Sequence, residues 1–109
     1  MNKEKIEKII ENLAKNGYHL DNKTIKDNLI KLNFGNYCKF TFHLENEPLL
    51  IEAIMPIEYG VTFDQENVNF LNSITTYWSI YKHWLEFKFT PKSEEDLENT
   101  LLQLLESYN

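Results

Sequence analysis

The sequence contains no arginine, and all eleven of its basic residues are lysines. Arginine supplies the planar guanidinium that binds phosphate and guanine through two parallel hydrogen bonds, so its absence argues against nucleic-acid recognition. The charges are also unevenly distributed. Residues 1–40 contain eight lysines and five acids, whereas residues 41–109 contain three lysines and twelve acids. Because nucleic-acid-binding domains present basic surfaces, we expect no nucleic-acid partner.

Cysteine and long apolar runs are scarce as well. A single cysteine, Cys38, excludes an internal disulfide, and the first residues lack the apolar centre of a secretory signal. No apolar run approaches the ~20 residues needed to span a bilayer. The basic N-terminal helix described below could lie on a membrane surface, but its interleaved glutamates favour packing on a sheet. We therefore expect a cytoplasmic protein without a membrane partner.

The residue spacings that create reactive or ligand-binding sites are missing. The three glycines show no phosphate-binding spacing. Cys38 and His43 would lie on opposite faces of a strand, which excludes a cysteine–histidine pair. A calcium loop starting at Asp64 would need glycine at Asn69 and glutamate at Thr75. We predict a non-enzymatic protein with no catalytic residue, metal or cofactor.

The chain length and apolar content, 109 residues with 42% hydrophobic, fit one domain spanning residues 1–109. Its centre is the stretch 29–55, where two turn signals separate three predicted strands. The middle strand, residues 37–44, alternates between apolar and polar positions, with Cys38, Phe40, Phe42 and Leu44 on one face. Gly35-Asn36 is typical of a two-residue hairpin loop between the first two strands.

Amphipathic helices are predicted at both ends of the chain. The first covers residues 3–16 and ends at Asn16-Gly17. The last is capped by Ser93, with Asp96 in the capping-box position. The apolar stripes of these two helices are formed by Ile6, Ile9, Ile10, Leu13 and Ala14 and by Leu97, Leu101, Leu104, Leu105 and Tyr108, with Leu102 beside the second stripe.

Two segments are ambiguous. Residues 18–28 are predicted as a loop with possible extended pairing. Residues 65–81 fit a short helix at 65–73 followed by a strand at 74–81, or a single helix ending at Tyr81. The first reading adds a hairpin with a strand at 84–90; the second leaves a four-stranded sheet. Pro56 is expected to close the third strand.

These elements predict an α+β fold, in which N- and C-terminal amphipathic helices flank an antiparallel sheet of four to five strands, a three-strand meander plus a hairpin. The segment Leu50-Ile51-Glu52-Ala53-Ile54-Met55-Pro56-Ile57, followed by Asn67-Val68-Asn69-Phe70-Leu71-Asn72, is similar to the strand-to-helix passage of YbjN-like proteins. The order of elements also resembles class I type III secretion chaperones. The resemblance implies a dimeric, chaperone-like protein-binding module. The short middle helix, which merges with a Thr- and aromatic-rich run, departs from that pattern.

Aromatic residues exceed what one core needs. Trp84 lies opposite Leu85, Phe87 and Phe89 along its strand and is therefore expected to be exposed on the open side. Such residues could form a second small core beneath residues 64–74 or a surface for a partner or a second copy. The candidate partner-binding residues are Tyr37, Tyr81, Trp84, Glu94, Glu95 and Glu98.

Three functions remain open from the sequence. The first is a small acidic protein-binding module, acting as a monomer or a homodimer, that masks or escorts a protein partner. The second is an immunity or anti-defence inhibitor whose acidic C-terminal region blocks a basic nucleic-acid-binding enzyme. The third is an enzyme with a dispersed, unrecognised site.

Overall fold

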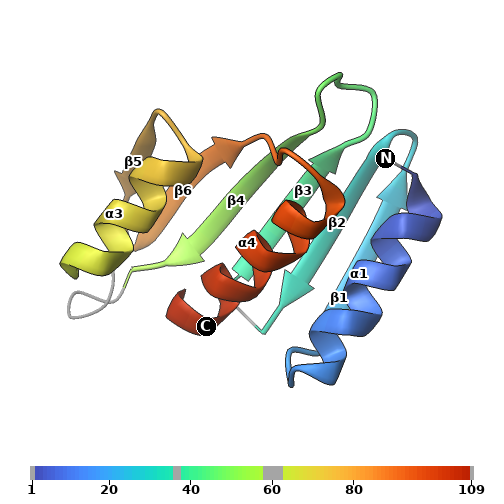
Figure 1. The fold of residues 1–109 in the computed structure, drawn as a ribbon, viewed down its shortest axis with the longest axis horizontal. Helices are drawn as coiled ribbons and strands as arrows, with labels where there is room; N and C mark the ends of the chain where they lie inside the picture. Colours follow the sequence, from blue (N-terminus) through green and yellow to red (C-terminus); the bar gives the residue numbers. More distant parts are fainter. Residues whose placement is uncertain (1, 36–37, 58–62, 109) are drawn as a thin grey trace.

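The computed structural model describes residues 2–35, 38–57 and 63–108, and Figure 1 shows the fold. The elements are, in chain order, α1 (Lys3–Lys15), β1 (Leu20–Lys26), β2 (Leu29–Phe34), β3 (Cys38–His43), β4 (Leu50–Pro56), α3 (Gln65–Ile74), β5 (Trp78–Tyr81), β6 (Trp84–Phe89) and α4 (Glu94–Tyr108). The six strands form one antiparallel sheet in the order β1-β2-β3-β4-β6-β5. The α+β class and the two terminal helices are confirmed.

The predicted strand count is corrected from four or five to six, because residues 20–26 form strand β1 instead of a loop. This strand begins a four-strand meander and pairs with β2 through the two-residue turn at Asp27-Asn28, where Asp27 has φ of 54°. Only Leu20 is partly buried along β1. An edge strand that buries almost nothing needs no alternation of apolar and polar residues. The sequence of residues 20–26 therefore carries no clear strand pattern.

The central strands match their predicted faces. Cys38, Phe40 and Phe42 of β3 are fully buried. Phe34 and Cys38 are paired, so three residues connect β2 to β3 and the predicted two-residue loop is wrong; Gly35 has φ of 64°. The rest of that loop, including Asn36 and Tyr37, lies outside the described residues. Pro56 ends β4 as expected, since a residue without a backbone donor suits the end of a strand.

The ambiguous segment 65–81 is a helix followed by a strand, so the single-helix alternative is wrong. The Asp64 carboxylate caps α3 by accepting a hydrogen bond from the backbone nitrogen of Glu66 at 2.9 Å. The helix ends at Thr75, which adopts extended backbone geometry. After β5, the two-residue turn at Lys82-His83 leads into β6, and Lys82 has φ of 55°.

The described helices α1, α3 and α4 lie on one face of the sheet (Figure 1). Their buried side chains join the alternate residues of β2, β3, β4 and β6 in one core. Leu71 of α3 is fully buried in this core, so residues 64–74 do not cover a second small core on the other face. The helix contribution comes from Ile6, Ile9, Leu13, Leu71, Leu97, Leu101, Leu104 and Leu105.

The terminal helices begin at side-chain caps. Asn2 Oδ1 accepts from Lys5 N at 2.9 Å at the start of α1, and Ser93 Oγ accepts from Asp96 N at 3.0 Å at the start of α4. Asp96 accepts from the backbone nitrogen of Lys92 at 2.8 Å, one residue earlier than a standard capping box would place the bond. Leu102 is half-buried beside the stripe. The side chain of Tyr108 lies outside the description.

Candidate binding surface

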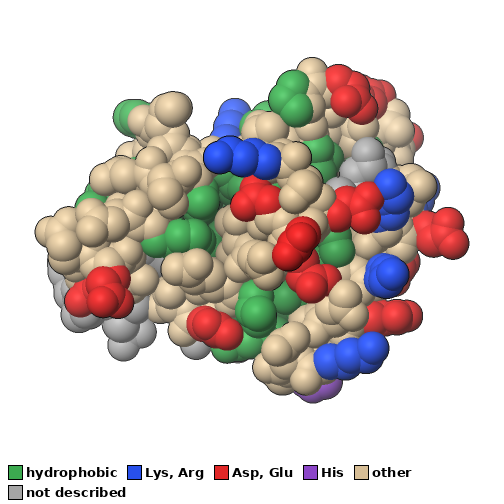
Figure 2. Space-filling model, in the orientation of Figure 1, with side chains coloured by type: hydrophobic (Ala, Val, Ile, Leu, Met, Phe, Trp, Pro, Cys, Tyr) green, Lys and Arg blue, Asp and Glu red, His purple; other side chains and the backbone are tan. Residues whose placement is uncertain are grey.

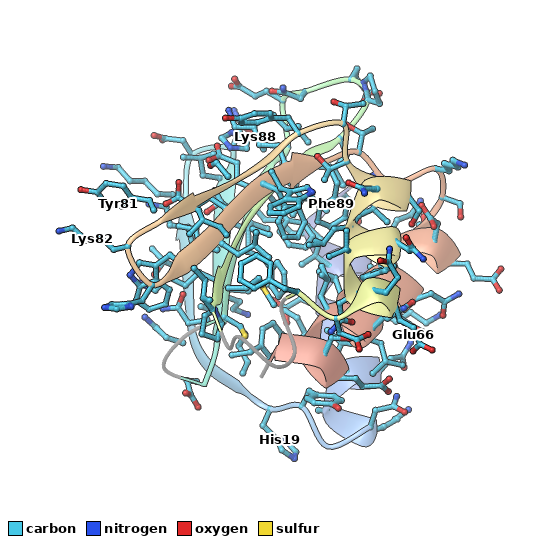
Figure 3. All side chains as sticks on the ribbon, turned by 90° about the vertical axis from the view of Figure 1, so that its left-hand side faces the viewer. His19, Glu66, Tyr81, Lys82, Lys88 and Phe89 are labelled. Carbon is cyan, nitrogen blue, oxygen red and sulfur yellow. The ribbon has the colours of Figure 1, made fainter. Side chains whose placement is uncertain are left out.

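The face of the sheet opposite the helices is not covered by any element in the described part of the chain. Figure 3 shows this arrangement edge-on: Phe89 points toward the helices, whereas Tyr81 and Lys82 extend away from them. We call this surface the open face. Strand register and alternation place on it Lys39, Thr41, His43, Leu50, Glu52, Ile54, Pro56, Ser79, Tyr81, Trp84, Glu86 and Lys88.

Two of the sequence-predicted residues come together on the open face. Pro56 pairs with Trp84, and Trp84 pairs with Tyr81, so these three residues form a cross-strand row. We call Pro56, Trp84 and Tyr81 the open-face row. Tyr81 is 60% exposed, and Lys82 Nζ lies 5.3 Å from its ring centroid. Trp84 is half-buried rather than exposed, because residues on both neighbouring strands flank it.

A groove of about 530 Å³ lies beside this row. The hydroxyl of Thr75 donates to the carbonyl oxygen of Lys88 at 2.7 Å and lies 3.4 Å from the backbone nitrogen of Tyr77. The β5–β6 ladder ends at the pair Trp78–Phe87, and one residue further along the Lys88 carbonyl bonds to Thr75. The groove is lined by residues that include Glu52, Ile54, Thr75, Tyr77, Ser79 and Glu86.

A side-chain contact between His43 and Glu52 on the open face was not predicted from the sequence. His43 Nε2 contacts Glu52 Oε1, and Lys88 lies opposite Glu52 in the register of β4 and β6. The residues are nine positions apart on adjacent strands, so their contact follows from the pairing of β3 with β4. The contact could have been predicted by assigning both residues to the same face of the meander and using the correct register of β3 and β4.

The acidic candidates belong to a different surface. Glu94, Glu95 and Glu98 lie on α4, in the helix layer, and Figure 2 shows carboxylates over this region with lysines nearby. Lys5 Nζ is 2.6 Å from Glu94 Oε1, and Asn12 Nδ2 donates to Glu98 Oε1 at 2.7 Å. The fold therefore separates the acidic candidates from Tyr81 and Trp84. The sixth candidate, Tyr37, is outside the described residues.

Cys38 and His43 lie on opposite faces of the sheet, so they cannot form a cysteine–histidine pair. Cys38 is fully buried on the helix-covered face, whereas His43 lies on the open face, as predicted. Burial raises the pKa of its thiol to about 11, which keeps it protonated near neutral pH. Within residues 2–35, 38–57 and 63–108, no group of three or more His, Cys, Asp or Glu side chains is placed to hold a metal ion.

Comparison with protein-family models, curated proteins and solved structures finds no match to this chain. None of the helices in the described part of the chain is long and apolar enough to cross a membrane.

Proposed function

We propose that this chain is a non-enzymatic protein-binding module that masks or escorts a protein partner through its open face. The observation that supports this most directly is the open-face row, where Pro56, Trp84 and Tyr81 present adjacent apolar surface on the side without helices. Aromatic residues surrounded by polar ones are typical of the energetic centre of a protein interface. Glu86 and Lys88 of β6 provide such a polar rim.

The alternative of an acidic inhibitor has less support from the same contacts. Glu94 and Glu98 already interact with Lys5 and Asn12 of α1. A basic enzyme bound at α4 would have to displace these contacts. Apolar contacts at the open-face row need little help from long-range attraction.

The partner should be identified by cross-linking rather than by capture alone. A photoreactive amino acid at position 86 should cross-link the partner, because Glu86 is exposed on the open face and belongs to β6, away from the β5 edge. The matched control is position 8, since Lys8 is exposed on α1 in the opposite layer. A partner that cross-links from position 8 and not from position 86 would contradict the proposed surface.

The effect of Trp84→Ala on affinity for the cross-linked partner can be predicted in magnitude. Trp84→Ala should weaken binding by about 2 kcal/mol or more, while the half-buried position limits the loss of folding stability. Binding is measured by calorimetry and stability by urea unfolding. A collapse in stability with binding intact would assign Trp84 to the core and move the interface to α4.

Salt dependence distinguishes the two candidate functions. Binding through the open-face row should change little between about 0.1 and 0.5 M salt, because apolar contacts are not screened. A steep loss of the association rate over this range would instead favour charge masking of a basic enzyme. The acidic residues of α4 would then be the site to mutate.

A further inference from the structure

The edge of the sheet at β5 carries an unusual concentration of exposed apolar side chains. Tyr77 is 74% exposed, Ile80 is 42% exposed and Tyr81 is 60% exposed. All three belong to residues 75–81, Thr-Thr-Tyr-Trp-Ser-Ile-Tyr, which contain no charged residue. We call this stretch the edge segment. Natural sheets usually protect an edge strand with charges, so an uncharged apolar edge indicates that a partner covers it.

Backbone directions along β5 follow from one hydrogen bond at the other side of β6. Ile57 N donates to the carbonyl oxygen of His83 at 2.9 Å, which makes residues 57 and 83 a bonded pair. Bonded and non-bonded pairs alternate in an antiparallel ladder, so His83 and every second residue after it direct their backbone N–H and C=O groups toward β4. The residues between them, Trp84 and Glu86, direct these groups toward β5. Their partners are Tyr81 and Ser79. The intervening residues Trp78 and Ile80 therefore direct their N–H and C=O groups toward the open edge.

This edge is complementary to itself. If two β5 strands meet antiparallel about a two-fold axis at Ser79, Trp78 of each copy lies opposite Ile80 of the other. The outward backbone groups of these residues then pair with each other. On the open face, Tyr77 lies opposite Tyr81 of the second copy, and the small Ser79 side chains meet at the axis. Registers shifted by two residues in either direction would satisfy only one of these pairings.

The neighbouring helix is compatible with this arrangement. Figure 1 places α3 at the same end of the sheet as β5, so the two-fold axis brings the two α3 helices near each other. The sequence of α3, Gln65–Ile74, contains one charged residue, Glu66. The approach of two copies therefore brings little like charge together, although the whole chain has a net charge of -6.

We propose that two copies of this chain form a homodimer by antiparallel pairing of their β5 strands about Ser79. The two sheets then join into one continuous sheet with a shared open face. Tyr81 of the second copy lies beside Tyr77, which lines the groove, so each groove is completed by a residue of the other copy. The dimer does not depend on binding of another protein, and its test uses the purified chain alone. Its failure would leave the proposed function untouched.

The decisive test uses opposite charges at the axis. Sedimentation equilibrium of the wild-type chain should show a concentration-dependent dimer. Ser79→Lys or Ser79→Glu should each raise the dimer dissociation constant about tenfold or more, because two like charges face each other across the axis. Glu86 lies opposite Ser79 within the sheet, so it partly compensates the lysine and makes the glutamate variant the more disruptive one. An equimolar mixture of the two variants should restore a dimer.

The matched control lies on the other edge of the sheet. Asn22 of β1 is exposed and pairs with the uncharged Asn33, so Asn22→Lys and Asn22→Glu should leave the dissociation constant unchanged. A wild-type chain that stays monomeric at every concentration overturns the proposal. So does a mixture of the Ser79 variants that associates no better than either variant alone.

Amide hydrogen exchange tests the register without any substitution. The amides of Trp78 and Ile80 should exchange slowly in the dimer and rapidly in dilute monomer, because their N–H groups face the edge. The amides of Ser79 and Tyr81 should remain protected in both states, since they bond to β6. Protection of Trp78 and Ile80 that does not change with concentration contradicts pairing through this edge.

Discussion

At the residue scale, neighbouring side chains along each strand lie on opposite faces of the sheet and therefore have different environments. Cys38 and Lys39 are adjacent, yet the thiol is fully buried under the helices and the lysine is exposed on the open face. The burial that makes Cys38 useful for packing also suppresses its reactivity, because the thiolate is poorly solvated there.

This reasoning predicts how stability depends on pH through Cys38. Burial raises the pKa of the folded thiol from 9.0 to about 11, so the unfolded chain loses this proton first as the pH rises. The contribution to folding stability is complete below about pH 9 and is lost as the pH rises toward about 11. In urea unfolding, the wild-type chain should therefore lose more stability over this pH interval than the Cys38→Ala variant does.

Alkylation provides an independent check on the same residue. Iodoacetamide should leave the folded protein unmodified near pH 8 and should label Cys38 rapidly in urea. Fast labelling of the native protein would show that β3 opens frequently or that its register differs.

At the element scale, β5 is a short strand whose path is fixed by side-chain hydrogen bonds as well as by pairing. Its N-terminal side is held by the hydroxyl of Thr75, which contacts Lys88 O and the backbone of Tyr77. On the covered face, Trp78 Nε1 donates to Asn72 Oδ1 of α3 at 3.1 Å. The Thr75 contacts connect the end of α3 to β6, and Thr75, Tyr77 and Lys88 all line the groove.

Removing the Thr75 hydroxyl tests this role. Thr75→Val keeps the shape of the side chain but leaves the Lys88 carbonyl without this donor, so the free energy of unfolding should fall by about 1–2 kcal/mol. Thr76→Val is the control, since Thr76 is exposed one residue further along. Urea unfolding measures both effects. Equal losses in the two variants would mean that the hydroxyl bridge contributes nothing specific.

At the scale of the whole molecule, one core lies between the sheet and the helices α1, α3 and α4, and no described element covers the open face of the sheet. Phe42 lies at the middle of that core, paired with Ile30 on β2 and Ile51 on β4, and all three are buried. Because these side chains come from separate segments, losing one should weaken the whole fold rather than a single strand.

Phe42→Ala should therefore lower the free energy of unfolding by about 3–5 kcal/mol, a large part of the stability of a typical domain. Thr41→Ala, on the open face of the same strand, should cost less than about 1 kcal/mol. Thermal and urea unfolding measure the difference. An unchanged melting temperature for Phe42→Ala would show that the register of β3 is wrong.

The sequence alone determined the features that depend on neighbours along the chain. The alternation at Cys38, Phe40 and Phe42 identified a strand and its buried face, because a period of two is a local property. Ser93 marked the start of α4 for the same reason, since a cap acts within one helical turn. Aromatic and β-branched residues favoured a strand after the middle helix, although the sequence left a single helix open and placed the start of the strand at residue 74 instead of Trp78.

Tertiary structure decided everything that depends on pairing between distant segments. Strand β1 exists because β2 offers it a partner, and its own residues bury too little to reveal it. The insertion of β6 between β4 and β5 brings Trp84 beside Pro56, and the pairing of β3 with β4 brings His43 to Glu52. Packing of all three helices on one face leaves the other open. Local patterns specify which side of each strand is apolar, but strand order and register are set by the combined burial of the whole core.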